Sequence, residues 1–192
     1  MNIKDKVLKD RIIKKDKAIR KVIDIKWIFF VTVLAFILTL ILSGTSNKLL
    51  EDINLWIGLF IIIFFIFIGV FFDMIGIAVT SADEKPFHSM AAKKVRSAKS
   101  AIRLLKNSEK VSAFLNDVIG DICNIMSGSA GIVVSSVIAV KFKSDLVLTT
   151  LIVTSSIAAL TIGGKALGKS FAVNKSELIV YEFAKILSIF KR

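Results

Sequence analysis

The stretch that decides the fold is NDVIGDICNIMSGSAGIVVSSVIAV, residues 116–140. Polar or small residues recur through it at intervals of three or four, namely Asp117, Asp121, Asn124, Gly128, Gly131 and Ser135. This spacing predicts a helix that carries all six on one face. A carboxylate at bilayer depth is costly unless something compensates it. We therefore expect Asp121 to face other protein, an ion or the membrane interface.

Four long uncharged runs of 19 to 21 residues explain the apolar composition, which is 55% hydrophobic with a mean hydropathy of +0.74. A helix needs about 20 apolar residues to cross a bilayer. The sequence therefore predicts an all-α integral membrane protein with four transmembrane helices. The predicted spans are residues 27–47, about 55–80, 114–140 and 146–164.

Basic residues outnumber acidic residues by 27 to 15, which gives a net charge of +12. If all four runs cross the membrane, only Lys48, Lys141 and Lys143 lie on one side, and the other 24 basic residues lie on the opposite side. Because cytoplasmic loops are rich in Lys and Arg, we predict a multi-pass protein of the cell membrane with both termini cytoplasmic. No RNA- or DNA-reading motif accompanies the charge, so we expect no nucleic-acid partner.

Three segments outside the runs are expected at the cytoplasmic surface of the bilayer. Residues 1–26 are a basic amphipathic segment, which either a helix on the anionic leaflet or a solvated tail explains. Residues 87–110 combine a modest apolar face with many lysines and arginines, which predicts a basic helical hairpin. Residues 170–190 are predicted to form a C-terminal juxtamembrane amphipathic helix.

Polar and glycine residues gather near the predicted cytoplasmic ends of the second and fourth runs. Asp73 follows the Phe- and Ile-rich part of the second run and fits either the bundle interior or the membrane interface. Gly163 and Gly164 close the fourth run. We expect them to break the helix and expose carbonyls, which is one way to build an ion site in a membrane. Gly164 and Gly168 also fit a small-x3-small packing pattern.

The sequence lacks the usual signs of an enzyme. It contains one histidine and one cysteine, and neither a phosphate loop nor a paired nucleophile and base is visible. We therefore predict a protein that is not an enzyme, with Cys123 as a small buried apolar residue.

Three stretches together resemble the transmembrane domain of the CNNM/CorC magnesium transporters, also called the DUF21 domain. They are FFDMIGIAVTSADE (71–84), FLNDVIGDICNIMSGS (114–129) and TIGGKALGKSFA (161–172). The first stretch is similar to the small, polar end of the family's first span. The second is similar to the family's Gly-Asn motif, which has another Asn three residues later. The third is similar to the Gly-Glu-x-x-Pro-Lys-x-x-Ala motif that ends the family's last span. The likeness covers residues 53–192, so the span at 27–47 is an addition. The CBS domains of longer relatives do not follow here, and we expect no CBS-mediated regulation.

The resemblance implies a divalent-cation transport module with Mg²⁺ as the transported ion and a homodimer as the assembly. In the family, Ser, Asn and Glu side chains bind a dehydrated Mg²⁺ together with nearby backbone carbonyls. The residues that this implies as ligands here are Asp73, Asp121, Asn124 and Gly164. Ser81 and Asp117 are further polar candidates near the same site.

Two departures from the family leave two interpretations open. The acidic ligand of the family's last span is Lys165 here, whereas Asp73 and Asp121 add carboxylates. Either an oxygen-rich site remains, as hard cations require, or Lys165 salt-bridges Asp121 or Asp73 and replaces the bound ion. The second interpretation describes a non-transporting membrane interaction or regulatory relative.

Overall fold

The structure is a computed structural model that describes residues 25–50 and 54–190. Within these residues the regular elements are helices, which confirms the all-α prediction. Residues 1–24 lie outside the described part, so the basic amphipathic segment at 1–26 stays a prediction. In chain order the elements are α2 (Ile25–Leu50), α3 (Leu55–Ser81), α4 (Lys85–Ala92), α5 (Arg96–Lys106), α6 (Ser108–Ala113), η1 (Phe114–Gly120), α7 (Asp121–Phe142), α8 (Leu146–Asn174) and α9 (Ser176–Phe190).

The chain divides into two units, Met1–Ile37 and Leu38–Arg192, and the division falls within α2. Phe29 and Phe36 are examples of its exposed apolar side chains. The structure describes the side chains of α2 over the apolar stretch Lys26–Ile41. This stretch is shorter than a full membrane span. The crossing predicted at 27–47 therefore stays a prediction.

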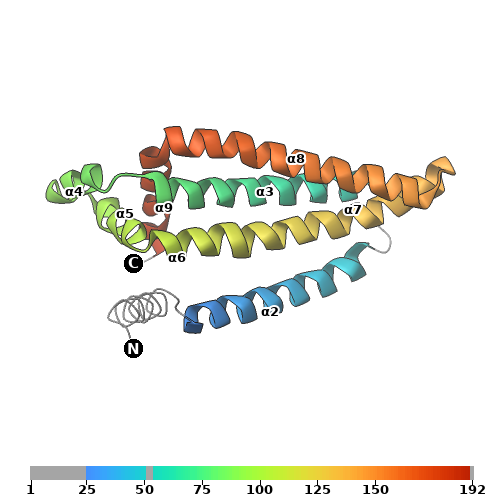
Figure 1. The fold of residues 1–192 in the computed structure, drawn as a ribbon, viewed down its shortest axis with the longest axis horizontal. Helices are drawn as coiled ribbons and strands as arrows, with labels where there is room; N and C mark the ends of the chain where they lie inside the picture. Colours follow the sequence, from blue (N-terminus) through green and yellow to red (C-terminus); the bar gives the residue numbers. More distant parts are fainter. Residues whose placement is uncertain (1–24, 51–53, 191–192) are drawn as a thin grey trace, which may run out of the picture. The chain divides into compact units, whose positions relative to one another are not determined.

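Three helical stretches of the second unit are long and apolar enough to cross a membrane: Leu55–Ser81, Ser108–Phe142 and Leu146–Asn174. They lie side by side, and each packs against the other two (Figure 1). Their outward surfaces carry large apolar side chains such as Phe60, Phe67 and Leu160. An apolar surface of this extent belongs in lipid. The chain is therefore a multi-pass membrane protein.

The middle stretch is longer than the predicted span at 114–140 and contains an irregular turn. Its backbone is helical from Ser108 to Phe142, but η1 has the i→i+5 pattern of a π-helix. Such segments are rare and often accompany functional sites. The helix ends at Lys143, which has a left-handed φ of 52°. The next helix begins at once, because Asp145 Oδ1 accepts a hydrogen bond of 2.9 Å from the Leu148 amide and caps α8.

The predicted break at Gly163 and Gly164 is wrong, because α8 continues without interruption to Asn174. Gly164 and Gly168 instead allow close packing of α8 on α3. A Cβ atom at Gly164 would lie 2.9 Å from Val70 Cγ2, and one at Gly168 would lie 3.3 Å from Val70 Cγ1. The small-x3-small pattern is thus used inside one chain, and contact with α3 stabilises a helix that glycine alone would weaken.

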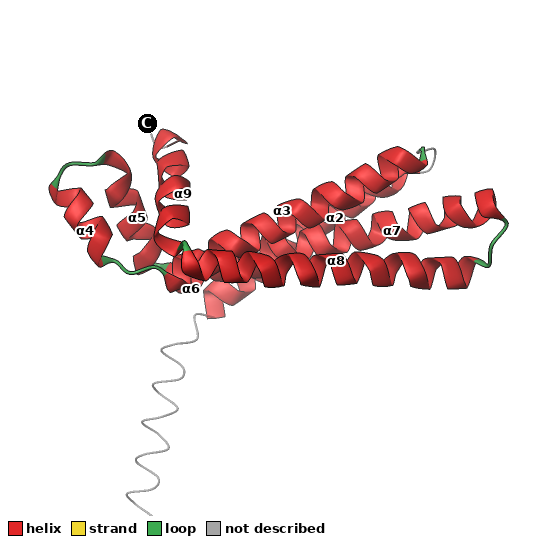
Figure 2. Ribbon diagram, turned by 90° about the horizontal axis from the view of Figure 1, so that it is seen from above, coloured by secondary structure: helices red, strands yellow, loops and turns green. Residues whose placement is uncertain are grey.

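Three shorter helices gather at one end of the bundle (Figure 2). Here α4 and α5 form the helical hairpin predicted at 87–110. Phe87 of α4 and Val180 of α9 are fully buried in one core with Ile75 and Val79 of α3. The amphipathic helix α9 begins at Ser176, later than predicted, because α8 occupies the preceding residues.

Candidate functional site

The candidate site centres on Asp73 of α3 and Lys165 of α8. Lys165 Nζ lies 3.9 Å from Asp73 Oδ1, and the side chains are 27% and 14% exposed, respectively. Charge-assisted hydrogen bonds between such groups measure about 2.7–2.9 Å. The two groups therefore attract each other without a direct hydrogen bond. Asp73 is largely covered by protein beside Lys165 of α8.

Three further charges lie close enough to Asp73 to interact with it, namely Asp117, Asp121 and Lys169. Lys165 also lies over Gly120, where a Cβ atom would be 3.8 Å from its Nζ. The cluster thus combines three carboxylates with two ammonium groups. If all five are ionised, it carries one negative charge that no protein group of the cluster compensates.

Asp121 lies near Asp73 but is less enclosed. Its side chain is exposed, and among the described residues none forms a hydrogen bond or an ion pair with it. The six-residue polar face is not uniform, because Gly131 and Ser135 are buried while Asp117 and Asp121 are exposed. The π-helical turn η1 also shifts Asp117 away from the regular α-helical spacing. The carboxylate enclosed by the bundle is Asp73.

Asn124 and Gly164 both lie beside the same turn of α3. A Cβ atom at Gly69 would be 3.9 Å from Asn124 Oδ1, and Gly164 packs against Val70. These α3 residues are about one turn before Asp73. Ser81, in contrast, is the exposed last residue of α3, about 12 Å along the helix from Asp73 at 1.5 Å per residue. The structure therefore groups Asn124 and Gly164 with Asp73 and leaves Ser81 apart.

Asn116 in η1 is a candidate site residue that was not predicted from the sequence. Its Nδ2 donates to Ser112 Oγ at 3.3 Å, but its Oδ1 is buried and has no hydrogen-bond partner among the described residues. The same oxygen occupies the space that a side chain at Gly76 would fill. Buried polar atoms are almost always paired, so this amide oxygen is open to a partner such as a water molecule or a cation. Asn116 could be recognised only from its position opposite Gly76 on the neighbouring helix, and the spacing of residues along the sequence does not reveal this position.

The oxygen atoms of this region do not form a finished metal cage. Among the described residues, no three His, Cys, Asp or Glu side chains are placed to hold one metal ion together. The enclosed carboxylate of Asp73, the unpaired amide oxygen of Asn116 and the nearby amide of Asn124 are nevertheless ligands of the kind that hard cations prefer.

Comparison with models of known families identifies a family for this chain. A sequence profile described as the CNNM Cyclin M transmembrane N-terminal domain matches residues 60–192. Searches of curated proteins and of solved structures returned no match. The profile covers most of α3, the other two membrane-length helices and the hairpin, as the resemblance of the three sequence stretches predicted. On this evidence, the chain belongs to the CNNM family and carries its transmembrane domain.

Proposed function

We propose that this chain is a divalent-cation transport module whose cargo is Mg²⁺. The observation that carries the proposal is the charge of the cluster around Asp73, in which three carboxylates face two lysines. A negative charge at bilayer depth is costly unless something compensates it. A cation from solution provides this compensation, and membership of the CNNM family favours Mg²⁺.

The oxygen atoms near the cluster suit this cargo. The resemblance places a family carboxylate at Gly76, where this chain has no side chain. The amide oxygen of Asn116 fills the same space from the neighbouring span. We propose that Asp73, Asn116 and Asn124 contact the ion as it passes, and that Asp121 adds negative charge beside them. Water molecules would complete the shell, because Mg²⁺ gives up its hydration reluctantly.

A second function is favoured by the distance of 3.9 Å between Lys165 Nζ and Asp73 Oδ1. If the ammonium group remains in this place permanently, it substitutes for the ion, and the protein is a non-transporting relative. We favour transport, because the pair is partly exposed, lacks a direct hydrogen bond and leaves one carboxylate of the cluster in excess. In this scheme Lys165 partly compensates Asp73 between transport events.

Mg²⁺ uptake into proteoliposomes tests the proposal and separates the two functions. We expect wild type to take up Mg²⁺, and Asp73→Asn to lower the initial rate by about tenfold or more, since tenfold corresponds to only about 1.4 kcal/mol. Asp145→Asn is the matched control, because Asn caps a helix as well as Asp does and Asp145 lies at the start of α8.

If wild type takes up no Mg²⁺, the uptake and stability of Lys165→Gln show which role Lys165 has. If this variant folds and gains uptake, Lys165 acts as a plug in an otherwise intact site. If it loses stability and gains no uptake, the ion pair is structural and the non-transporting function is supported.

We further propose that the protein resides in the cell membrane with both termini cytoplasmic. Of the 14 Lys and Arg residues between 54 and 190, all but Lys141 and Lys143 lie toward the bundle end that carries α4, α5 and α9. The positive-inside rule assigns that end to the cytoplasm, and a crossing by α2 then places the N-terminus on the same side.

A homodimer is part of the same proposal. In a single copy, Asp117 and Asp121 are exposed on a membrane-length helix, where lipid would surround them. A second copy would cover this surface and exclude lipid from the carboxylates. The mass of the protein in detergent, corrected for bound detergent, tests this, and a strictly monomeric mass at all concentrations contradicts it.

A further inference from the structure

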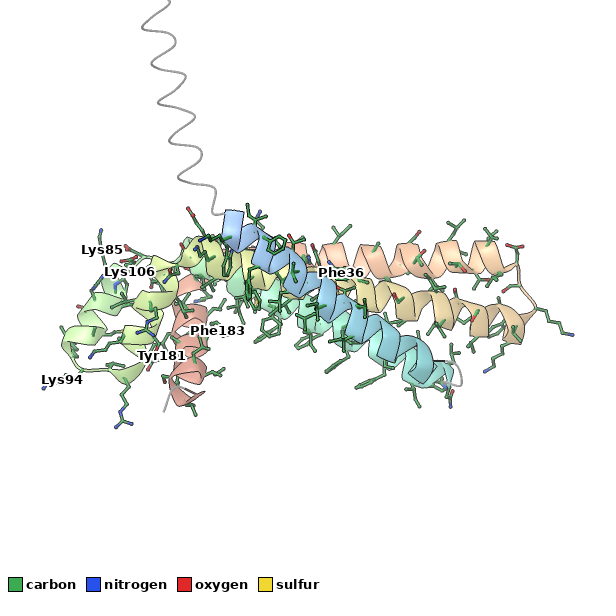
Figure 3. The ribbon with its side chains drawn as sticks, turned by 90° about the horizontal axis from the view of Figure 1, so that it is seen from below. Phe36, Lys85, Lys94, Lys106, Tyr181 and Phe183 are labelled. Carbon is green, nitrogen blue, oxygen red and sulfur yellow. The ribbon has the colours of Figure 1, made fainter. Side chains whose placement is uncertain are left out.

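A pocket of about 650 Å³ lies between the beginning of α5 and the second half of α9, outside the membrane-length helices. This volume is in the range of sites that bind small molecules. Its polar lining combines two cationic groups with hydroxyls, from Arg96, Ser97, Ser100, Tyr181, Lys185 and Ser188. The side-chain view shows Tyr181 on α9 beside the hairpin, where Lys94 and Lys106 also lie (Figure 3). The ion site around Asp73 uses none of these residues.

The charge of the pocket is positive. Arg96 and Lys185 line it, and the lining includes no acidic side chain. Glu182 is the nearest charge of opposite sign on α9, with its Oε2 3.7 Å from Lys185 Nζ. Because both side chains are more than half exposed, this pair contributes little and does not hold Lys185 in place. Arg96 and Lys185 are therefore available to an anion.

One hydroxyl of the pocket lining lacks a partner in the described part of the chain, whereas the hydroxyl of Ser188 donates to the Lys185 carbonyl at 2.7 Å. Ser97 is only 5% exposed, yet among the described residues none forms a hydrogen bond with its hydroxyl. The N-cap of α5 is the apolar Val95, which provides no side-chain oxygen to the first amides of the helix. The unpaired hydroxyl of Ser97 and an uncapped helix N-terminus thus meet beside Arg96. Anions bind readily in such a place.

From these observations we propose that the pocket binds a phosphate group. Arg96 would contact two phosphate oxygens, Lys185 would add a second positive charge, and the Ser97 hydroxyl would donate a hydrogen bond. Two sources present this chemistry: the headgroup of an anionic phospholipid and a phosphate compound in solution. The first source is within reach, because α9 follows α8 directly and exposes Leu178, Ile186 and Leu187.

The experiment uses the full chain, with inorganic phosphate in detergent as one arm and nanodiscs as the other. The nanodiscs contain phosphatidylcholine with or without about one-fifth phosphatidylglycerol, and native mass spectrometry counts the phosphatidylglycerol molecules that remain bound. We expect Arg96→Gln/Lys185→Gln to weaken phosphate affinity, or retention of phosphatidylglycerol, by about tenfold or more. The control Lys99→Gln/Lys175→Gln removes the same charge from exposed positions outside the pocket and should change either value by less than about twofold.

Each outcome has a defined meaning. Loss of phosphate binding in the pocket variant assigns a soluble phosphate compound, and loss of phosphatidylglycerol retention alone assigns a lipid headgroup. The proposal is overturned if neither probe binds wild type, or if the pocket and control variants lose binding equally. Should the double variant fail to fold, Lys185→Gln alone is used, since this side chain is more than half exposed. Ser97→Ala, which keeps every charge, should still weaken binding.

Discussion

The ion pair between Asp73 and Lys165 makes a quantitative prediction for a double-mutant cycle with Asp73→Asn and Lys165→Gln. Two unit charges 3.9 Å apart attract each other by about 4 kcal/mol at an effective dielectric constant of 20 and by about 1 kcal/mol in water. The side chains are 27% and 14% exposed, so they lie between these environments. We expect a coupling free energy of about 1–3 kcal/mol between the two positions.

The assay measures the free energy of unfolding of the four proteins in mixed micelles with increasing dodecyl sulfate. A cycle with Asp145→Asn and Lys175→Gln is the control, because these positions lie at opposite ends of α8 and should couple by less than about 0.5 kcal/mol. Repeating the cycle in millimolar Mg²⁺ adds a second test. If the ion competes with Lys165 for Asp73, the coupling should fall.

A coupling below about 0.5 kcal/mol without Mg²⁺ would refute the ion pair, and with it the argument that Lys165 compensates Asp73. A coupling that is large and unchanged by Mg²⁺ would support the non-transporting function, because the ammonium group would then hold its place against the ion.

Two further predictions concern packing and topology. Gly163→Ala should stabilise the protein by up to about 1 kcal/mol, because nothing lies within 4 Å of the new Cβ. Gly164→Ala should be at least about 1 kcal/mol less stable than Gly163→Ala, because its Cβ would be 2.9 Å from Val70 Cγ2. Equal unfolding free energies of the two variants would contradict the packing of α8 on α3. Fluorescent proteins fused to the two termini should both fluoresce in the cytoplasm, and an N-terminal fusion that is dark while the C-terminal one fluoresces would show that α2 does not cross.

Much of the fold could be predicted because membrane helices leave a strong signal in composition. The runs that begin near Leu55 and at Leu146 are uncharged and long, and both are membrane-length helices in the structure. The hairpin was predictable from its apolar and basic periodicity. The continuity of α8 was not, because one of the two glycines that suggest a break, Gly164, packs against Val70 of a different span. Tertiary contact overrides local propensity here.

The candidate site was predictable in its residue types but not in its geometry. Asp73, Asn124 and Lys165 were recognised from the sequence, and the structure brings them to neighbouring turns of three helices. The exposure of Asp121 was not predictable, because it depends on which neighbours surround a helix and not on spacing along it, and its role at the site stays a prediction. Asn116 was missed for the same reason, since its buried oxygen is significant only beside Gly76.

The most direct test of the central claim is a calorimetric titration of the purified protein with Mg²⁺, compared between wild type and Asp73→Asn. If the enclosed carboxylate attracts a cation from solution, wild type gives a saturable heat at millimolar Mg²⁺ or below, and Asp73→Asn loses it while Asp145→Asn retains it. A wild-type protein that gives no heat at millimolar Mg²⁺, or an Asp73→Asn variant that binds as tightly as wild type, would contradict the claim.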